Sequence, residues 1–306
     1  MVDRCHAIVE GFSFDALPAG FERHLFEYGV GHRWNPKLKL KIGVLTLTFP
    51  TPTIMHIRGS IQKSATGNNY GDFTYSEAIW HLQCLSEFIG VPLDRFRITS
   101  LELGINLAVR YDPRCYWDMF NRYGKNRYIL LAPLKNTYQP HGRKCYYCDY
   151  DIKVYDKTFE SSHSSHEPRE VAKAVPKNLV RFEVRFKSKA LKRLGWGTVT
   201  GATLLDEGFK AKLLTQMENM FESTVFNKLP GDCSKLTMEQ MQKVTFALSE
   251  DYDRYLAAVK EAYPSRYAKE LANRRMTLKN YLPLINNKYE RELRRKFHAK
   301  LPKLSA

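Results

Sequence analysis

The sequence lacks any run of about 18–20 apolar residues, the length that a helix needs to cross a bilayer, so we expect no membrane span. Its first residues, MVDRCHAIVEGF, hold no apolar stretch of the kind found in signal peptides. The pattern G-x-x-x-x-G-K-[ST] is also absent, which excludes a helicase of the phosphate-loop class. No internal repeat is present. We therefore expect a protein of the cytoplasm.

Cysteine and acidic residues are both scarce. The six cysteines are scattered along 306 residues, a usage typical of reduced thiols in a cytoplasm. Asp and Glu total 32 against 48 Lys and Arg, a formal net charge of +16. A basic surface attracts polyanions, so nucleic acid is the expected partner. A membrane surface is the alternative, which the lack of long apolar runs disfavours.

The apolar content is sufficient for a substantial core, with 43% hydrophobic and 13% aromatic residues. Alternating or β-branched runs predict strands at 37–49, 53–62, 96–109, 127–133, 143–157 and 179–187. A helix is predicted from an N-cap at Ser76 to Gly90, and a short one at 114–123. Residues 161–178 are polar and predict a surface loop. This order of elements indicates an α+β fold with a mostly antiparallel sheet.

The pattern becomes helical after about residue 203. Helices are predicted at 203–228, 236–248, 250–263, 265–275 and 277–298. Residues 254–306 hold 14 Lys or Arg against 4 Asp or Glu, a net charge of +10. The sequence therefore predicts two regions, 1–200 with the sheet and 201–306 with basic helices, and we expect the second to supply most non-specific affinity for nucleic acid.

Charged residues interrupt three of the predicted strands. Arg181, Glu183 and Arg185 alternate with apolar residues in LVRFEVRFK, so they share one face of a strand. Glu102 lies in TSLELGINLAV, and DIKVYDKTFE carries further charges. One interpretation is a solvated face with cross-strand ion pairs. The other is a site for a metal ion and a phosphate, because charge is costly to bury without a partner.

The segment RKCYYCDYD places Tyr146, Tyr147 and Tyr150 between basic residues. A phenol has a pKa of about 10 and is a poor nucleophile at neutral pH unless cations or a metal stabilise its ionised form. Attack of such a tyrosine on DNA would leave a phosphotyrosine link that conserves the energy of the broken bond. The alternative is that these are strand aromatics that pack against their neighbours.

Cys145 and Cys148 form a single C-x-x-C pair, and His163 with His166 would complete a four-ligand zinc set. Residues three apart on a strand face opposite sides, which argues against zinc, although the sequence leaves it open. A His-hydrophobic-His pair is absent, which excludes the two-histidine metal motif of well-known single-strand nicking enzymes.

The order of several segments resembles the filamentous-phage gene II type replication proteins and, more distantly, the tyrosine-dependent rolling-circle initiators of small Gram-positive plasmids. The resemblance spans roughly residues 40–195 and is carried by the segments RGSIQK, GNNYGDFTYSEAIWHL, RFRITSLELGINL, KCYYCDYDIKVYDKTFE and LVRFEVRFKSKALKRLG. It implies a nicking and joining domain in residues 1–200, followed by a helical DNA-binding or accessory region in 201–306.

The resemblance also implies roles for single residues. Tyr146 matches the nucleophile best, Tyr147 is second, and Tyr150 and Tyr138 are further candidates. Glu102 and Glu183 match the metal ligands, and Asp156 and Glu160 match them less well. The cations that we expect around the phosphate are Lys153, Lys157, Arg181 and Arg185. The expected cofactor is Mg²⁺ or Mn²⁺.

The sequence thus predicts a replication initiator that nicks one strand of an origin and leaves a 5′-phosphotyrosine and a 3′-OH primer. Its expected partners are origin DNA, a host helicase and a host polymerase, and a homodimer is left open. A relaxase of a mobile element would use the same chemistry. A third reading is a DNA-binding regulator without catalysis, in which residues 277–298 would be the recognition helix.

Overall fold

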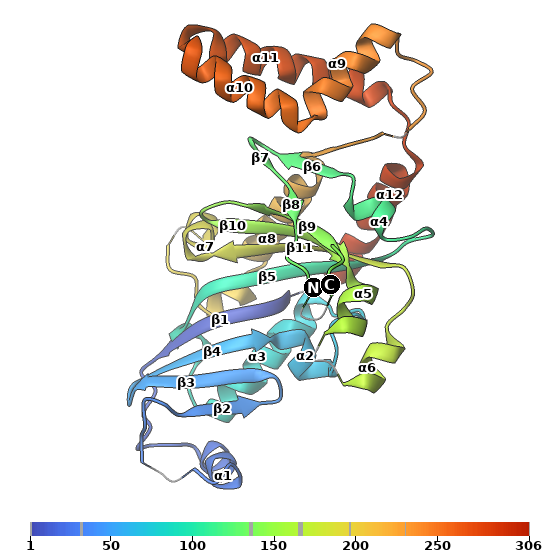
Figure 1. The fold of residues 1–306 in the computed structure, drawn as a ribbon. Coiled ribbons are helices and arrows are strands. Elements are labelled where there is room, and N and C mark those ends of the chain that lie inside the picture. Colours follow the sequence, from blue (N-terminus) through green and yellow to red (C-terminus); the bar gives the residue numbers. More distant parts are fainter. Residues whose placement is uncertain are drawn as a thin grey trace.

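The computed structural model describes residues 2–30, 33–134, 137–164, 168–195, 197–229 and 231–305. A large antiparallel sheet forms the centre of the molecule, helices lie on its faces, and a separate group of helices lies beyond the β6–β7 end (Figure 1). The α+β class with a helical C-terminal region, as the sequence predicts, is confirmed.

The main sheet has nine strands in the order β2-β3-β4-β1-β5-β11-β10-β9-β8, and each neighbouring pair is antiparallel. The strands are β1 (Val2–Glu10), β2 (Lys39–Ile42), β3 (Leu45–Thr51), β4 (Ile54–Ser60), β5 (Phe96–Ala108), β8 (Ile129–Leu130), β9 (Gly142–Tyr146), β10 (Tyr150–Asp156) and β11 (Leu179–Lys187). A small second sheet joins β12 (Thr224–Phe226), β6 (Phe120–Tyr123) and β7 (Asn126–Arg127). The centre of the main sheet therefore unites β1, β5 and β11, which are far apart in the chain.

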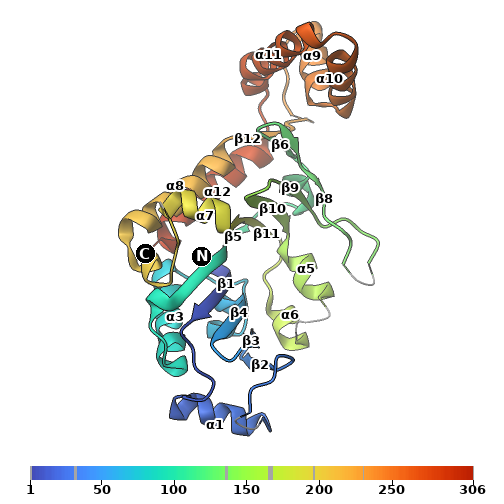
Figure 2. The same ribbon diagram turned by 90° about the vertical axis from the view of Figure 1, so that its left-hand side faces the viewer.

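Helices cover the two faces of the main sheet unequally (Figure 2). One face is covered by α3 (Tyr75–Ile89), α7 (Ser188–Gly195), α8 (Glu207–Glu222) and α12 (Lys288–Leu304). Of the described helices, the short α5 (Lys157–His163) and α6 (Arg169–Ala174) lie on the other face. The remaining α-helices are α1 (Ala19–Glu27), α2 (Ile61–Thr66), α4 (Arg114–Trp117), α9 (Met238–Leu248), α10 (Glu250–Ala262) and α11 (Pro264–Tyr281).

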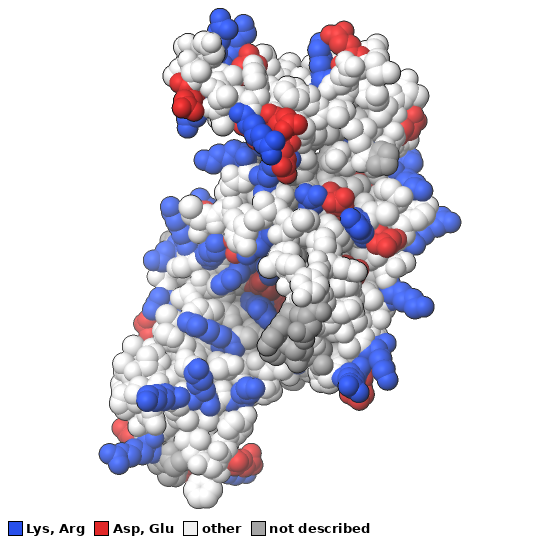
Figure 3. Space-filling model, in the orientation of Figure 1, with Lys and Arg blue, Asp and Glu red and all other residues white. Residues whose placement is uncertain are grey.

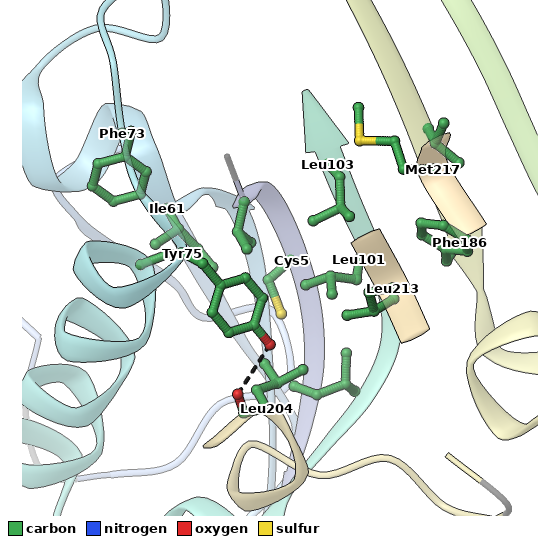
Figure 4. Close-up of a cluster of buried hydrophobic side chains, with 14 of the residues drawn as sticks. Cys5, Ile61, Phe73, Tyr75, Leu101, Leu103, Phe186, Leu204, Leu213 and Met217 are labelled. Carbon is green, nitrogen blue, oxygen red and sulfur yellow. Dashed lines mark hydrogen bonds between the residues drawn. The ribbon is translucent and has the colours of Figure 1, made fainter. Parts of the chain in front are cut away.

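The main core lies between the well-covered face of the sheet and its helices. Leu101 and Leu103 of β5 and Phe186 of β11 meet Leu213 and Met217 of α8 there (Figure 4). On α12, Phe297 stacks on Phe221 of α8 with ring centroids 3.9 Å apart. Residues beyond position 200 therefore complete the core under the sheet, whereas the division of function at that position stays a prediction.

Several predicted strands have different limits in the structure. Residues 37–49 and 143–157 are hairpins rather than single strands, with turns at Gly43 and at residues 147–149. Apolar residues occur on both sides of each turn, and at Gly43 the turn is marked only by a change of phase in their alternation between Val44 and Leu45. In the predicted strand 53–62, β4 ends at Ser60, whose side chain accepts a hydrogen bond from the Lys63 N–H and caps α2. Residues 127–133 contain only the end of β7 and the two-residue β8.

Helix limits also differ from the predictions. Thr74, not Ser76, caps α3, because Thr74 and Glu77 form a reciprocal capping box. The predicted loop 161–178 contains the end of α5 and all of α6, and residues 114–123 and 203–228 each end in a short strand after their helix.

Residues 277–298 are not one helix. Helix α11 continues from 264 to Tyr281, and α12 begins at Lys288 after Asn287, whose side chain accepts hydrogen bonds from the Tyr289 and Glu290 N–H groups. Pro283 lies in the short 3₁₀ turn between the two helices. A single recognition helix over 277–298 is therefore wrong. Among the described residues, no helix is both long and apolar enough to cross a membrane.

We predict that Phe297→Ala lowers the free energy of unfolding by about 3–5 kcal/mol, because it opens a cavity beside Phe221 in the main core. The matched control is Phe26→Ala on α1, whose side chain is 73% exposed and whose loss should cost less than about 1 kcal/mol. Urea unfolding of both variants measures the difference. Equal losses would show that α12 is not part of the core.

Candidate metal and phosphate site

The face of the main sheet opposite the core is polar at its centre. Along β11, Val180, Phe182, Val184 and Phe186 point into the core, so Arg181, Glu183, Arg185 and Lys187 share the other face. The register places Glu183 beside Gly104 of β5 and Lys153 of β10. The sequence prediction of one charged face on this strand is confirmed.

Asp3 joins this face through an irregularity in β1. Val2 pairs with Leu103 and Arg4 with Glu102, so two steps along β1 match a single step along β5. Asp3 is the extra residue of this bulge, a feature that re-aims side chains. Its carboxylate therefore lies with those of Glu102 and Glu183, although sequence reasoning did not select it. The only signal was an acidic residue in the otherwise alternating run VDRCHAIVE.

Three carboxylates converge on adjacent strands β1, β5 and β11. One oxygen from each of Asp3, Glu102 and Glu183 lies within 4.8 Å of the others, and all three residues are buried. Among the described residues, this is the only group of three or more Asp, Glu, His or Cys side chains close enough to hold a metal ion. Glu102 and Glu183, the two expected metal ligands, therefore lie close together, whereas their binding of a metal ion stays a prediction.

Arg181 links two of these carboxylates. Its Nη2 donates to Asp3 Oδ2 at 2.7 Å, and its Nε donates to Glu183 Oε1 at 2.7 Å. Its Nη1 donates to the Asn106 Oδ1 at 3.0 Å and to the Asn69 carbonyl at 2.9 Å. A Cβ at Gly104 would lie 2.3 Å from Arg181 Nη2, so glycine at this position leaves room for the guanidinium. Arg181 is thus a buried structural cation of the site.

Lys153 provides the second cation. Its Nζ lies 2.9 Å from Glu183 Oε2 and 3.3 Å from Glu102 Oε2. The Tyr155 hydroxyl also donates to Glu183, at 2.9 Å from Oε1. Because the Lys153 side chain is 25% exposed, it is the cation of the site that can reach solvent or a ligand.

The two glutamates have opposite electrostatic environments. Burial and the nearby charge of Glu183 raise the pKa of Glu102 to about 7, against the opposing effect of Lys153. Burial would also raise the pKa of Glu183, but Lys153 and Arg181 outweigh it and hold that pKa below its ordinary value. Glu183 is therefore the fixed anion of the cluster, and Glu102 exchanges a proton near neutral pH.

The cluster is suited to a hard divalent ion. Three carboxylates supply oxygen ligands of the kind that Mg²⁺ and Mn²⁺ prefer. When Glu102 is ionised, three negative charges face two directly paired cations, Arg181 and Lys153, which leaves one negative charge to offset. A metal ion bound between Glu102 and Glu183 would take the position of the Lys153 ammonium, so Lys153 would have to move toward solvent.

A basic hollow of about 490 Å³ opens beside Glu102 and Lys153. Its lining includes the cations Arg4, Arg58 and Arg185 and the imidazole of His6. Burial and the neighbouring Arg58 lower the pKa of His6 to about 4, so the neutral ring accepts a hydrogen bond from Arg58 Nε at 2.9 Å. Lys and Arg side chains also predominate over the strands on this side of the molecule (Figure 3). The hollow therefore attracts an anion such as a phosphate.

The tyrosines separate onto two faces of the β9–β10 hairpin. Tyr146 pairs with Asp151, and Lys144 pairs with Lys153, so Tyr146 shares the face of Lys153 and Glu183. The Tyr146 side chain is 52% exposed, and Lys144 Nζ lies 3.9 Å from its ring centroid. Strands about 4.8 Å apart and residues about 3.4 Å apart along each strand place the Tyr146 Cα about 12 Å from that of Glu183.

Tyr147 belongs to an aromatic cluster instead. Its hydroxyl donates to the Tyr123 carbonyl at 2.6 Å, and its ring stacks on Tyr150 with centroids 4.7 Å apart. Burial raises the pKa of Tyr147 and, further, that of Tyr150. Tyr138 is 97% exposed, in the segment between β8 and β9.

The other sequence candidates lie outside the carboxylate group. Asp156 caps α5 by accepting a hydrogen bond from the Phe159 N–H, and the buried Lys157 pairs with Glu160. Glu160 lines a smaller hollow of about 240 Å³, which Lys153 and the three carboxylates also line. Arg185 donates to the Ser100 hydroxyl at 3.1 Å.

The proposed zinc ligands are not assembled in the described part of the chain. Cys145 is buried and Cys148 exposed, and both are free thiols. His163 stacks on Phe159 with centroids 4.0 Å apart. His166 lies outside the described residues.

We predict that Glu102→Gln and Glu183→Gln have opposite effects on stability, measured with a chelator present. The pKa of Glu102 is raised from 4.5 to about 7 in the folded protein. The folded state therefore binds this proton more tightly than the unfolded state does. The bound proton stabilises the fold fully below pH 4.5, and this stabilisation is lost as the pH rises through 7. Glu102→Gln should thus stabilise the protein by up to about 3 kcal/mol at pH 8 and by little at pH 4.5.

Glu183→Gln should instead destabilise the protein by about 3 kcal/mol or more at pH 8, because Lys153 and Arg181 lose their shared anion. Unfolding curves at both pH values test the pair. Loss of stability in both variants at pH 8 would show that the ionised Glu102 stabilises the fold through Lys153 and that its pKa is not raised.

Comparisons with known proteins give one weak likeness. No protein-family model matches the sequence, and no curated protein matches it either. A solved structure described as the rolling circle replication initiator protein from Geobacillus stearothermophilus is 12% identical, with a TM-score of 0.37. The likeness covers 72% of this chain and 84% of that one, and it is too low to show a shared fold.

Proposed function

We propose that this protein nicks one strand of DNA through Tyr146 and initiates rolling-circle replication. The observation that carries the proposal is the placement of Tyr146 on the same sheet face as the Asp3, Glu102 and Glu183 carboxylates, with Lys153 between them. The order of sequence segments supports it independently, because it resembles that of phage and plasmid initiators.

In this proposal, the basic hollow holds the DNA backbone. Arg4, Arg58 and Arg185 surround the space beside Glu102 and would bind phosphates on either side of the scissile one. Lys144 lies against the Tyr146 ring, where it would hold the phosphate that the hydroxyl attacks. The three carboxylates would hold Mg²⁺ or Mn²⁺, which supplies positive charge to the scissile phosphate when it is bound.

The reaction exchanges one phosphodiester bond for another. The Tyr146 oxygen forms a bond to phosphorus and gives up its proton to water, and the bond from phosphorus to the 3′ oxygen breaks. The 3′ oxygen takes up a proton and becomes the free 3′-OH that primes synthesis. Lys153 can move from its carboxylates to the phosphate, because part of its side chain reaches solvent. A host helicase and polymerase would act after the nick.

We further propose that the exposed cations of residues 254–306 add sequence-independent affinity for the duplex. This region cannot be tested by cutting the chain near residue 250, because Phe297 and Leu293 of α12 belong to the main core. Single charge substitutions on exposed positions are the suitable probe.

We predict that Tyr146→Phe abolishes formation of the covalent DNA adduct, whereas Tyr147→Phe retains it. The first substitution removes an exposed hydroxyl on the sheet face that carries the cluster, and the second removes one that is bound to the Tyr123 carbonyl. Each variant is incubated with Mn²⁺ and supercoiled DNA that carries the sequence around the gene. The amount of nicked circular DNA is quantified on a gel, and the modified peptide is identified by mass spectrometry.

An adduct in Tyr146→Phe that disappears in Tyr147→Phe would contradict the assignment. No nick and no adduct with the unmodified protein would favour a DNA-binding regulator without catalysis.

We predict that Glu102→Gln lowers the nicking rate at least about 100-fold and leaves DNA affinity within about twofold, as expected for a group that acts on the reacting phosphate. Because this variant should not be destabilised, the loss cannot come from unfolding. Glu10→Gln is the control, since Glu10 is an exposed carboxylate at the far end of β1 that pairs with Arg97. Nicking and anisotropy-based binding are measured together, and full activity in Glu102→Gln would remove Glu102 from the site.

A further inference from the structure

Helix α11 is long but poorly packed. It spans 18 residues, and Arg274 is its only fully buried side chain among them. Helices in globular proteins owe most of their stability to burial of an apolar face. The core shared by α9 and the segment after α11 is also small, with Val244, Leu248, Leu282 and Ile285 as its buried members. One face of α11 is therefore available for a further partner.

That face lines a groove of about 650 Å³. Its walls are one side of α10, one side of α11 and the turn between β6 and β7. Four leucines line the groove: Leu256 and Leu282 are buried, and Leu271 and Leu278 are half-buried. The stretch from Tyr267 to Leu282 covers 15 residue steps, which is about 22 Å of helix at 1.5 Å per residue. The groove thus has the length of about four helical turns.

The rim of the groove is strongly basic. Its lining contains six cations and a single acid, Asp253; the cations are Arg122, Lys125, Lys260, Arg274, Arg275 and Lys279. Asp253 is already paired, with Arg122 Nη2 at 2.6 Å and Arg274 Nη1 at 2.7 Å, and it also binds Arg127. Although burial opposes it, these hydrogen bonds lower the pKa of Asp253 to about 2. Asp253 therefore stays ionised and paired with these arginines. The remaining cations at the rim favour an anionic ligand.

We propose that this groove binds an acidic amphipathic helix of a partner protein. Aliphatic or aromatic side chains of that helix lie on the leucine floor, and its carboxylates meet Lys260, Arg275 and Lys279 at the rim. Recognition of this kind uses anchors at positions i, i+3, i+4 and i+7. A nucleic-acid strand fits the floor less well, because unpaired bases bind through stacking on aromatic rings, and Tyr267 is the one aromatic residue of the lining.

The test uses a fluorescein-labelled helical peptide of 16 residues, with leucine at the anchor positions and glutamate on both flanks. A twin peptide has lysine in place of each glutamate, and a 16-nucleotide single strand serves as the nucleic-acid probe. We expect the acidic peptide to bind the full chain, and the lysine twin to bind at least about tenfold more weakly.

The variant Lys260→Glu with Lys279→Glu should lower the affinity for the acidic peptide at least about tenfold, which is about 1.4 kcal/mol of binding free energy. The matched control is Lys269→Glu with Lys303→Glu, which makes the same charge change at two exposed positions outside the groove, and it should change affinity less than about twofold. Circular dichroism and unfolding midpoints verify the fold of each variant.

Three results would overturn the proposal. The first is that the unmodified protein does not bind the acidic peptide. The second is equal binding of that peptide by the groove variant and the control. The third is that the protein binds the single strand, and that the groove variant lowers the affinity for this strand but not for the peptide. That result would identify the groove as a nucleic-acid site.

Discussion

The buried guanidinium of Arg181 is the constraint on which the centre of the structure depends. It bonds Asp3 and Glu183 and fills the space above Gly104, and so connects β1, β5 and β11 across the polar face of the sheet. A buried arginine is costly unless its donors are satisfied, and here Asn106 and the Asn69 carbonyl take the remaining bonds. The carboxylates are consequently held close together with their charges largely compensated.

The sheet can keep such a polar centre because its two faces differ. The core face is sealed by helices from both halves of the chain, including α8 and α12, and supplies the apolar burial that stabilises the fold. Of the described helices, α5 and α6 lie over part of the opposite face, and Lys153, the basic hollow and Tyr146 remain accessible. A rigid cluster beside an accessible surface is an arrangement suited to chemistry on a large anionic substrate.

The group of helices α9, α10 and α11 is joined to the rest of the protein by a second, partly buried ion cluster. Arg122 and Arg127 of the small sheet bind Asp253 of α10, and Arg274 of α11 binds the same carboxylate. Arg127 also donates to the Leu248 carbonyl at the end of α9 at 2.7 Å. Polar contacts thus fix the position of these helices, while their apolar core stays small.

The sequence by itself determined the fold class and the charged face of β11, because alternation along a strand assigns side chains to faces without knowledge of the neighbours. It also selected Glu102 and Glu183, since a carboxylate between core leucines or phenylalanines needs a partner. The tertiary structure alone decided Asp3, because a bulge breaks the alternation that sequence reasoning uses. It also decided which tyrosine faces the cluster, because the turn at residues 147–149 sends Tyr146 and Tyr147 to different surroundings. Asp156 was indistinguishable from a ligand in the sequence, and only the fold shows it as a helix cap. Local patterns fix which face a residue occupies, whereas contacts between β1, β5 and β11, far apart in the chain, fix what it meets there.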